Sequence, residues 1–214
     1  MARRLGAGAR KPAIATAPAP AMPSAQQLAE ERASKISALV AKGDEAQKRN
    51  DLIAALEAFR GAQSLAKDDA SLNARVDAVS QLIKMQKVSE HIEKAKEASQ
   101  ARDYHGAASH WEKAWEGRRE DATLLLNAAD ILAKAKEHKR AAELAQRVIA
   151  IDPKAVKAHY ILAVVFTEAG LRASARSAIE HLAKLEPTHP QLKELKEKLG
   201  PLSIAEQFGL RGSR

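Results

Sequence analysis

The sequence predicts an all-α protein, a solenoid of stacked helical hairpins, and three observations lead to this fold class. The 214 residues are 45% apolar but only 3% aromatic, so alanine and aliphatic side chains, which suit closely packed helices, supply most of the apolar content. From Gln26 to Leu199, glycine and proline are sparse and apolar residues recur at helical spacing. Pro153 and Pro187 lie 34 residues apart, and the residues around them repeat with the same period, which is typical of helical repeat arrays.

The N-terminal segment, residues 1–25, differs from this pattern. Alanine, proline and glycine dominate it and no apolar period is visible, which predicts a disordered basic arm. Its four basic residues are not followed by the apolar segment of about 7–15 residues that a secretory signal needs, so a cytoplasmic location is expected. The longest strongly apolar run, 160–166, is far shorter than the roughly 20 residues of a membrane-spanning helix.

The repeated unit places small residues at fixed positions on two successive helices. Small side chains let two helices approach closely while larger neighbours fill the grooves between them. The units cover residues 36–69, 88–121, 122–155 and 156–189. Their first helices carry Gly43, Ala95, Ala129 and Ala163, and their second helices carry Ala55, Ala107, Ala141 and Ala175.

The last unit carries the fullest form of the pattern: His159-x2-Leu162-Ala163-x2-Phe166, then Ala175-x3-Ile179, then Pro187. This arrangement resembles the tetratricopeptide repeat. The resemblance implies helix pairs that bury their apolar faces by stacking into a superhelix. The segments AGLRASA at 169–175 and LEP at 185–187 also resemble repeat arrays attached to bacterial J-domain co-chaperones, although the chain contains no His-Pro-Asp motif.

The spacing divides the chain behind the arm into four further segments. Residues 26–69 are the first helical repeat, 70–87 an inserted helix, 88–189 three tandem tetratricopeptide-like repeats, and 190–214 a capping helix with a C-terminal tail. The absence of a helix breaker in 70–101 favours one long bridging helix over two, although the apolar stripe changes side near 84–87. In the tail, Ser203 and Glu206 have capping-box spacing, which predicts a last short turn.

Catalytic and metal-binding patterns are absent from the sequence. Without cysteine, the chain has no disulfides, thiolate zinc sites or cysteine nucleophiles. No phosphate-binding loop, dinucleotide fingerprint or His-Glu-x-x-His motif occurs, and the seven histidines are scattered. Trp111 and Trp115 have the helical spacing of core residues. We therefore expect no enzyme activity, no cofactor and no bound metal.

The net charge of +8 does not indicate nucleic-acid binding. Residues 1–33 and 190–214 contribute +3 and +2 of it, and residues 34–121 contribute nothing. Nucleic-acid modules present cations in a patch or stripe, and RNA modules interleave them with aromatic residues. Neither arrangement is visible here, so nucleic acid is not the expected partner.

The tetratricopeptide resemblance implies a binding surface, because the first helices of such arrays line a concave groove that holds extended or helical peptides. Transferred to this chain, the groove residues are Lys96, Asn127, Asp130, Lys134, Lys157, Tyr160 and Val164. Asparagine holds a peptide backbone through its donor and acceptor, lysines attract acidic segments, and a tyrosine is a rigid anchor. The expected function is a protein–protein interaction scaffold that binds a protein or peptide partner.

The alternative function is a chaperone-linked module, such as a co-chaperone or a J-domain-protein fragment, that binds a heat-shock chaperone. Tetratricopeptide domains that hold the acidic EEVD tails of such chaperones use a clamp of lysines, asparagines and an arginine. Asn127 and Lys157 match two clamp positions. The remaining three positions, occupied here by Ile92, Lys96 and Ile161, depart from the pattern.

Overall fold

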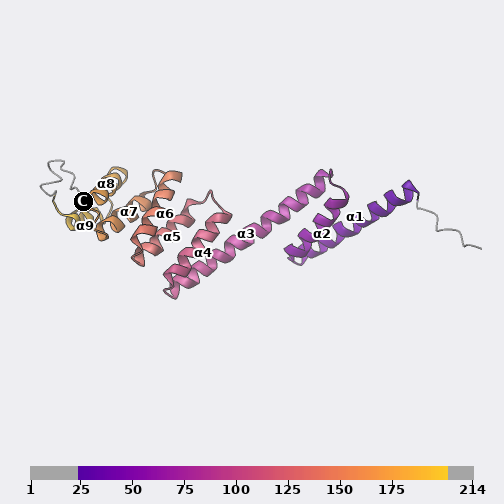
Figure 1. Cartoon of the computed structure of the whole chain (residues 1–214), viewed down its shortest axis with the longest axis horizontal. Coiled ribbons are helices and arrows are strands. Elements are labelled where there is room, and N and C mark those ends of the chain that lie inside the picture. Colours follow the sequence, from indigo (N-terminus) through magenta and orange to yellow (C-terminus); the bar gives the residue numbers. More distant parts are fainter. Residues whose placement is uncertain (1–23, 202–214) are drawn as a thin grey trace, which may run out of the picture. The chain divides into compact units, whose positions relative to one another are not determined.

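The computed structural model describes residues 24–201, and all regular structure within this range is helical (Figure 1). The predicted all-α repeat fold is confirmed. The helices are α1 (Ala25–Lys48), α2 (Leu52–Leu65), α3 (Ala70–Gln100), α4 (Tyr104–Gly117), α5 (Ala122–Lys134), α6 (His138–Ile151), α7 (Val156–Glu168), α8 (Arg172–Leu185) and α9 (Leu192–Leu199). Most of the predicted arm and the predicted capping box at Ser203 lie outside the described residues.

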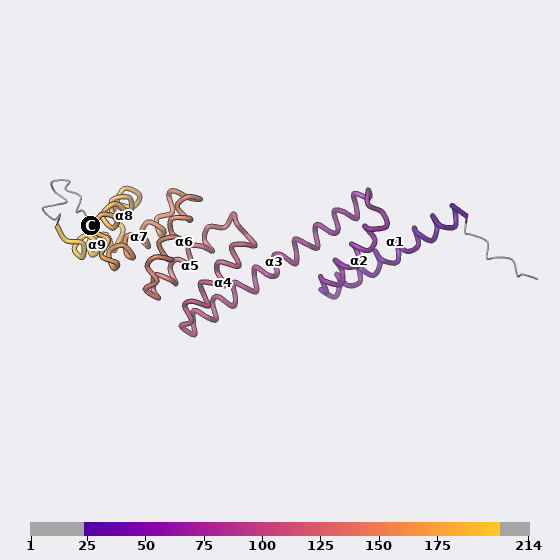
Figure 2. Tube along the Cα trace, viewed as in Figure 1, coloured from indigo at the N-terminus to yellow at the C-terminus, as the bar shows by residue number. Residues whose placement is uncertain are grey.

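The chain divides into two compact units, residues 1–77 and 78–214, and the division falls within α3. This helix continues without a break from Ala70 to Gln100 (Figure 2). Leu72 and Val76 are buried near its start, and Val88 and Ala95 are buried in its second half. Between these pairs, residues 84–87 are all exposed. The side chains at this point therefore contribute to neither core.

The core of the first unit is built around Phe59, which is fully buried on α2. Gly43 of α1 lies directly against its ring: a Cβ atom added at Gly43 would come within 2.5 Å of Phe59 Cε1. Arg75 of α3 lies over the same ring, 5.5 Å from its centroid, and forms an ion pair with Asp44. The small residue expected at position 43 is therefore required by contact between the two helices of the hairpin.

The second unit consists of helical hairpins that share one continuous core. Its largest fully buried side chains include Leu125, Val148, Ile161 and Leu182, which come from four successive helices. Each helix from α4 to α9 packs on the next one along the chain. In addition, α7 packs on both α5 and α9. α9, the predicted capping helix, closes the core with Leu192, Leu195 and Leu199.

The turns inside the hairpins reveal a periodic feature that the sequence had not suggested. One residue in each turn has a positive φ, and these residues are Asn50, Arg102, Lys136 and Gly170. Their spacing reproduces that of the buried alanines on the second helices. Only glycine adopts this conformation without a steric cost, so the repeat imposes it on an arginine and a lysine.

None of the described helices is long and apolar enough to cross a membrane.

Candidate functional site

The candidate site is a groove along one side of the second unit, formed by three adjoining depressions. The first depression lies between the end of α3, α4 and α5, the second between α5 and α7, and the third between α7 and α9. Asp130 lines both the first and the second depression. Tyr160, Val164 and Glu168 line both the second and the third. Because neighbouring depressions share these residues, they form one continuous groove.

The structure brings the seven predicted groove residues together. Six line the depressions: Lys96, Asn127 and Asp130 line the first, and Asp130, Lys134, Tyr160 and Val164 line the second. The seventh, Lys157, is about half-exposed, and its Nζ lies 3.8 Å from Asp130 Oδ2. The repeat period was sufficient to place these residues on one surface, because equivalent positions of successive first helices face the same way.

Each lysine of the groove lies close to a carboxylate of the chain, and Lys134 and Lys157 share one. Asp130 Oδ2 lies 2.9 Å from Lys134 Nζ and 3.8 Å from Lys157 Nζ. Lys96 Nζ lies 2.8 Å from Glu93 Oε1. An acidic segment of a partner would therefore compete with carboxylates that belong to the chain itself, which weakens the attraction that the sequence alone indicated.

Tyr160 lies at the junction of the second and third depressions and is half-buried. Its ring packs on that of His189, with 5.0 Å between the centroids. Burial raises the pKa of its hydroxyl above the ordinary value, and the carboxylates of Glu194, Asp130 and Glu168 raise it further. Lys198 acts in the opposite direction. Tyr160 is therefore a fixed aromatic group with carboxylates of three helices near its hydroxyl.

Sequence reasoning missed the part of the groove that α9 contributes. Gln191, Glu194, Leu195 and Lys198 line the third depression together with Glu168 at the end of α7. The sequence assigned 190–199 only to a cap. Its helical period could have given the signal, because α9 follows α7 at the position of a further first helix and presents its polar residues to the same side.

The positions of the acidic-tail clamp are altered in this groove. Ile161, where the resemblance leads one to expect arginine, is buried in the core of the second unit. Ile92 is partly buried against the same core. Lys157, one of the two matching residues, is close enough to Asp130 for an ion pair. Asn127, the other matching residue, lines the first depression together with Lys96 and Asp130.

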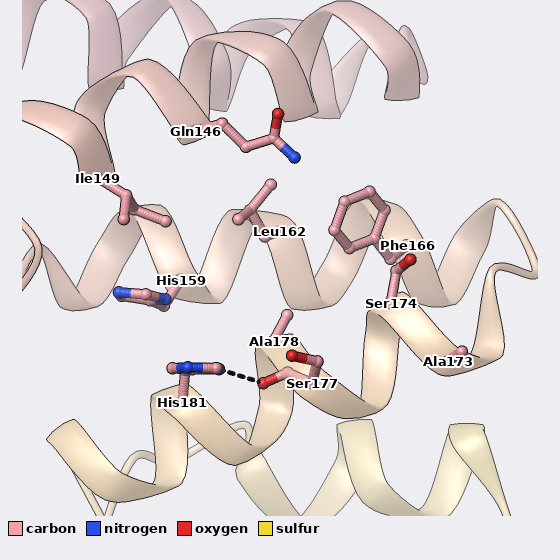
Figure 3. Close-up of a pocket in the computed structure, with 10 residues that line it drawn as sticks. All are labelled: Gln146, Ile149, His159, Leu162, Phe166, Ala173, Ser174, Ser177, Ala178 and His181. Carbon is pink, nitrogen blue, oxygen red and sulfur yellow. Dashed lines mark hydrogen bonds between the residues drawn. The ribbon is translucent and has the colours of Figure 1, made fainter. Parts of the chain in front are cut away.

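A separate depression of about 620 Å³ lies between α6, α7 and α8, apart from the groove. Figure 3 shows the rings of His159 and His181 stacked at one end and Phe166 and Leu162 along its wall. The two imidazole planes are 8° apart, with 5.8 Å between centroids. His159 Nε2 donates to the carbonyl oxygen of Pro153, and His181 Nδ1 donates to that of Ser177. We name this surface the α6–α8 depression, and its separation from the groove makes it a suitable comparison surface.

His91 of α3 and His110 of α4 form a contact that the sequence did not suggest. Their Nδ1 atoms lie 3.1 Å apart, so one nitrogen donates a proton and the other accepts it. Burial lowers the pKa of His91, and the neighbouring His110, Lys113 and Lys94 lower it further, whereas Glu90 opposes them. The folded state therefore favours the neutral form of His91, which retains this hydrogen bond.

This contact predicts that acid reduces the stability of the second unit. A lowered folded-state pKa means that the unfolded chain binds more protons below about pH 6.5, the ordinary value for histidine. The free energy of unfolding should fall as pH decreases from 7.5 to 5, with His91 contributing less than about 1 kcal/mol because its side chain is partly solvated. Urea titrations of the wild type, His110→Gln and the control His105→Gln measure this effect. The dependence of the unfolding free energy on pH should be weaker in His110→Gln and unchanged in His105→Gln. A wild-type dependence in His110→Gln would contradict the assignment.

In the described part of the chain, no group of three or more histidine, cysteine, aspartate or glutamate side chains is arranged to hold a metal ion.

Residues 132–199, about a third of the chain, match the tetratricopeptide repeat family. The tetratricopeptide domain of OM64 from Arabidopsis has 21% sequence identity and a TM-score of 0.50, and the match covers 54% of this chain and 96% of that domain. The second such domain of human RPAP3, solved in complex with an HSP70 peptide, has 18% identity and a TM-score of 0.51. That match covers 56% of this chain and 99% of that domain.

No curated protein matches the chain significantly by sequence. At these levels of identity, the two solved domains share the fold with this chain, and the family match assigns the repeats themselves. Residues 132–199 therefore match the tetratricopeptide repeat family, and the chain shares the all-helical repeat fold of the two solved domains.

Proposed function

We propose that the chain is a non-enzymatic scaffold that binds a segment of a partner protein in the groove along α3, α5, α7 and α9. The supporting observation is the continuity of the groove, in which neighbouring depressions share Asp130, Tyr160 and Val164. Such a strip suits an extended or helical segment, which needs contacts at successive positions. Asn127 offers a donor and an acceptor to a peptide backbone, and Tyr160 offers a rigid anchor.

A photo-crosslinking residue tests which surface the partner occupies. Benzoylphenylalanine is placed at Val164 in the groove or at Ser174 in the α6–α8 depression, and the protein is irradiated in an extract of the cells that make it. The proposal expects a discrete protein adduct from position 164 that is absent from position 174. Adducts from position 174 alone would place the binding surface in the α6–α8 depression.

The affinity of the captured partner should then depend on the groove residues. Asn127→Ala combined with Lys157→Ala is expected to weaken capture about tenfold, or ~1.4 kcal/mol, because the partner loses a backbone contact and a cation. Thermal stability should change little, since Lys157 is about half-exposed and Asn127 has no hydrogen-bond partner among the described side-chain contacts. The matched control is Gln146→Ala with Ser174→Ala in the α6–α8 depression. Equal capture by both double variants would contradict the groove as the binding surface.

The second candidate function is a chaperone-linked module that binds the acidic tail of a heat-shock chaperone. It is favoured by the clamp matches at Asn127 and Lys157 and by the fold shared with the RPAP3 domain, whose structure contains the HSP70 peptide SGPTIEEVD. The pairing of Asp130 with the lysines and the burial of Ile161 favour the first candidate. Fluorescence polarisation with SGPTIEEVD and a scrambled peptide distinguishes the two: only a tail-binding module would prefer the native order.

A further inference from the structure

The part of the groove around Tyr160 has a distinct chemical character. We name it the Tyr160 site and define it by Tyr160, Val164, Glu168, Glu194 and Leu195, which come from α7 and α9. It combines an aromatic ring, two apolar side chains and two carboxylates in one depression. The carboxylate of Asp130 approaches it from α5, because Asp130 and Tyr160 line the second depression together.

Glu168 is the one carboxylate of the Tyr160 site without a lysine or arginine partner among the described residues. Asp130 Oδ2 lies 2.9 Å from Lys134 Nζ and 3.8 Å from Lys157 Nζ, and Lys198 Nζ lies 2.7 Å from Glu194 Oε1. Glu168 has no such partner among the described residues: the nearest cationic group is His138, whose Nδ1 lies 3.8 Å from Glu168 Oε2. That distance is too long for a hydrogen bond, and the contact is an ion pair only when the histidine is protonated.

The pKa of the Tyr160 hydroxyl reflects the carboxylates that lie near it. Carboxylates from three helices raise the pKa of its hydroxyl, in addition to the effect of burial, and one ammonium group lowers it. Because Glu168 has no lysine or arginine partner, whereas Asp130 and Glu194 each have one, the partner side chain that complements this depression is positively charged.

We propose that the Tyr160 site binds a lysine or arginine side chain of the partner segment. The Glu168 carboxylate accepts the charge-assisted hydrogen bonds, and the ring of Tyr160, held by His189, lies alongside the cation. Val164 and Leu195 contact the aliphatic stem, as apolar walls do for long basic side chains. The inference rests on the proposed function, since it names the chemistry of the segment that the groove holds.

A charge-reversal selection tests the Tyr160 site with random peptides in place of the natural partner. A phage-displayed library of random short peptides is selected on the wild type, on Glu168→Lys and on the control Glu143→Lys, whose substituted residue is exposed on α6. Wild type and Glu143→Lys should enrich peptides with a lysine or arginine at one shared position. Glu168→Lys should enrich aspartate or glutamate at that position. Circular dichroism confirms that all three proteins remain folded.

A synthetic fluorescent peptide from the wild-type selection gives the quantitative test. Its dissociation constant should rise about tenfold in Glu168→Gln, a substitution that keeps the shape and removes the charge, and stay unchanged in Glu143→Gln. Acidic consensus peptides, or a basic preference that Glu168→Lys leaves intact, would overturn the cation site while leaving the scaffold function standing. The selected peptides are also tested for cross-linking to benzoylphenylalanine at position 164. If none of them cross-links there, the proposed function is overturned and, with it, this inference.

Discussion

Phe59→Ala is expected to reduce the free energy of unfolding of the first unit by about 3–5 kcal/mol, the range measured when large buried aromatic side chains are truncated. Phe59 is fully buried, and both Gly43 and Arg75 contact its ring. On the α1 side the ring lies against Gly43, which has no side chain that could move into the cavity. The loss is a large fraction of the stability of a small helical unit.

Hydrogen exchange resolves this effect by unit. Amides of α2 should lose protection in Phe59→Ala, whereas amides of α7 in the second unit should keep theirs, because the two units have separate cores. Ile53→Ala is the matched control on the same helix, since Ile53 is 66% exposed, and it should change little. Protection in α2 that survives Phe59→Ala would show that the ring does not support this core.

Ala141→Leu and Ala175→Leu are each expected to destabilise the second unit by about 1–3 kcal/mol through overpacking. Both alanines have no exposed surface and belong to its continuous core. A leucine at either position requires space that neighbouring helices already fill, so the backbone or the surrounding rotamers must shift. Replacing alanine also brings no gain in helix propensity that could offset this cost.

Urea denaturation followed by circular dichroism measures the two variants. Ala150→Leu, at an exposed position of α6, is the control and should be nearly neutral. Neutral behaviour at both 141 and 175 would mean that the alanines are not contact positions of the repeat, in conflict with their burial.

The repeat period alone placed the small residues of the core correctly. Gly43 and the seven alanines at the equivalent positions are all buried, including those in units that lack the closing proline. This succeeded because close helix contact tolerates only small side chains, so the requirement recurs in the sequence wherever the contact recurs. The same periodicity brought the seven groove residues to one surface.

Contacts between helices could not be predicted in the same way, because they join residues whose sequence separation carries no pattern. Asp130 and Lys157 meet across α5 and α7, and His91 and His110 meet across α3 and α4. A histidine or a carboxylate has the same identity in the sequence whether it faces water or a charged neighbour. The charge available to a partner in the groove depends on these pairings.

The amino-acid sequence by itself determined the helical repeat, its small-residue contacts and the surface on which the groove residues lie, since each follows from a period along one chain. Only the tertiary structure decided that Lys134 and Lys157 lie against Asp130, that α9 extends the groove, and that Glu168 has no lysine or arginine partner beside Tyr160. Electrostatic interactions depend on distance in space and on burial, and both are fixed only when the helices pack.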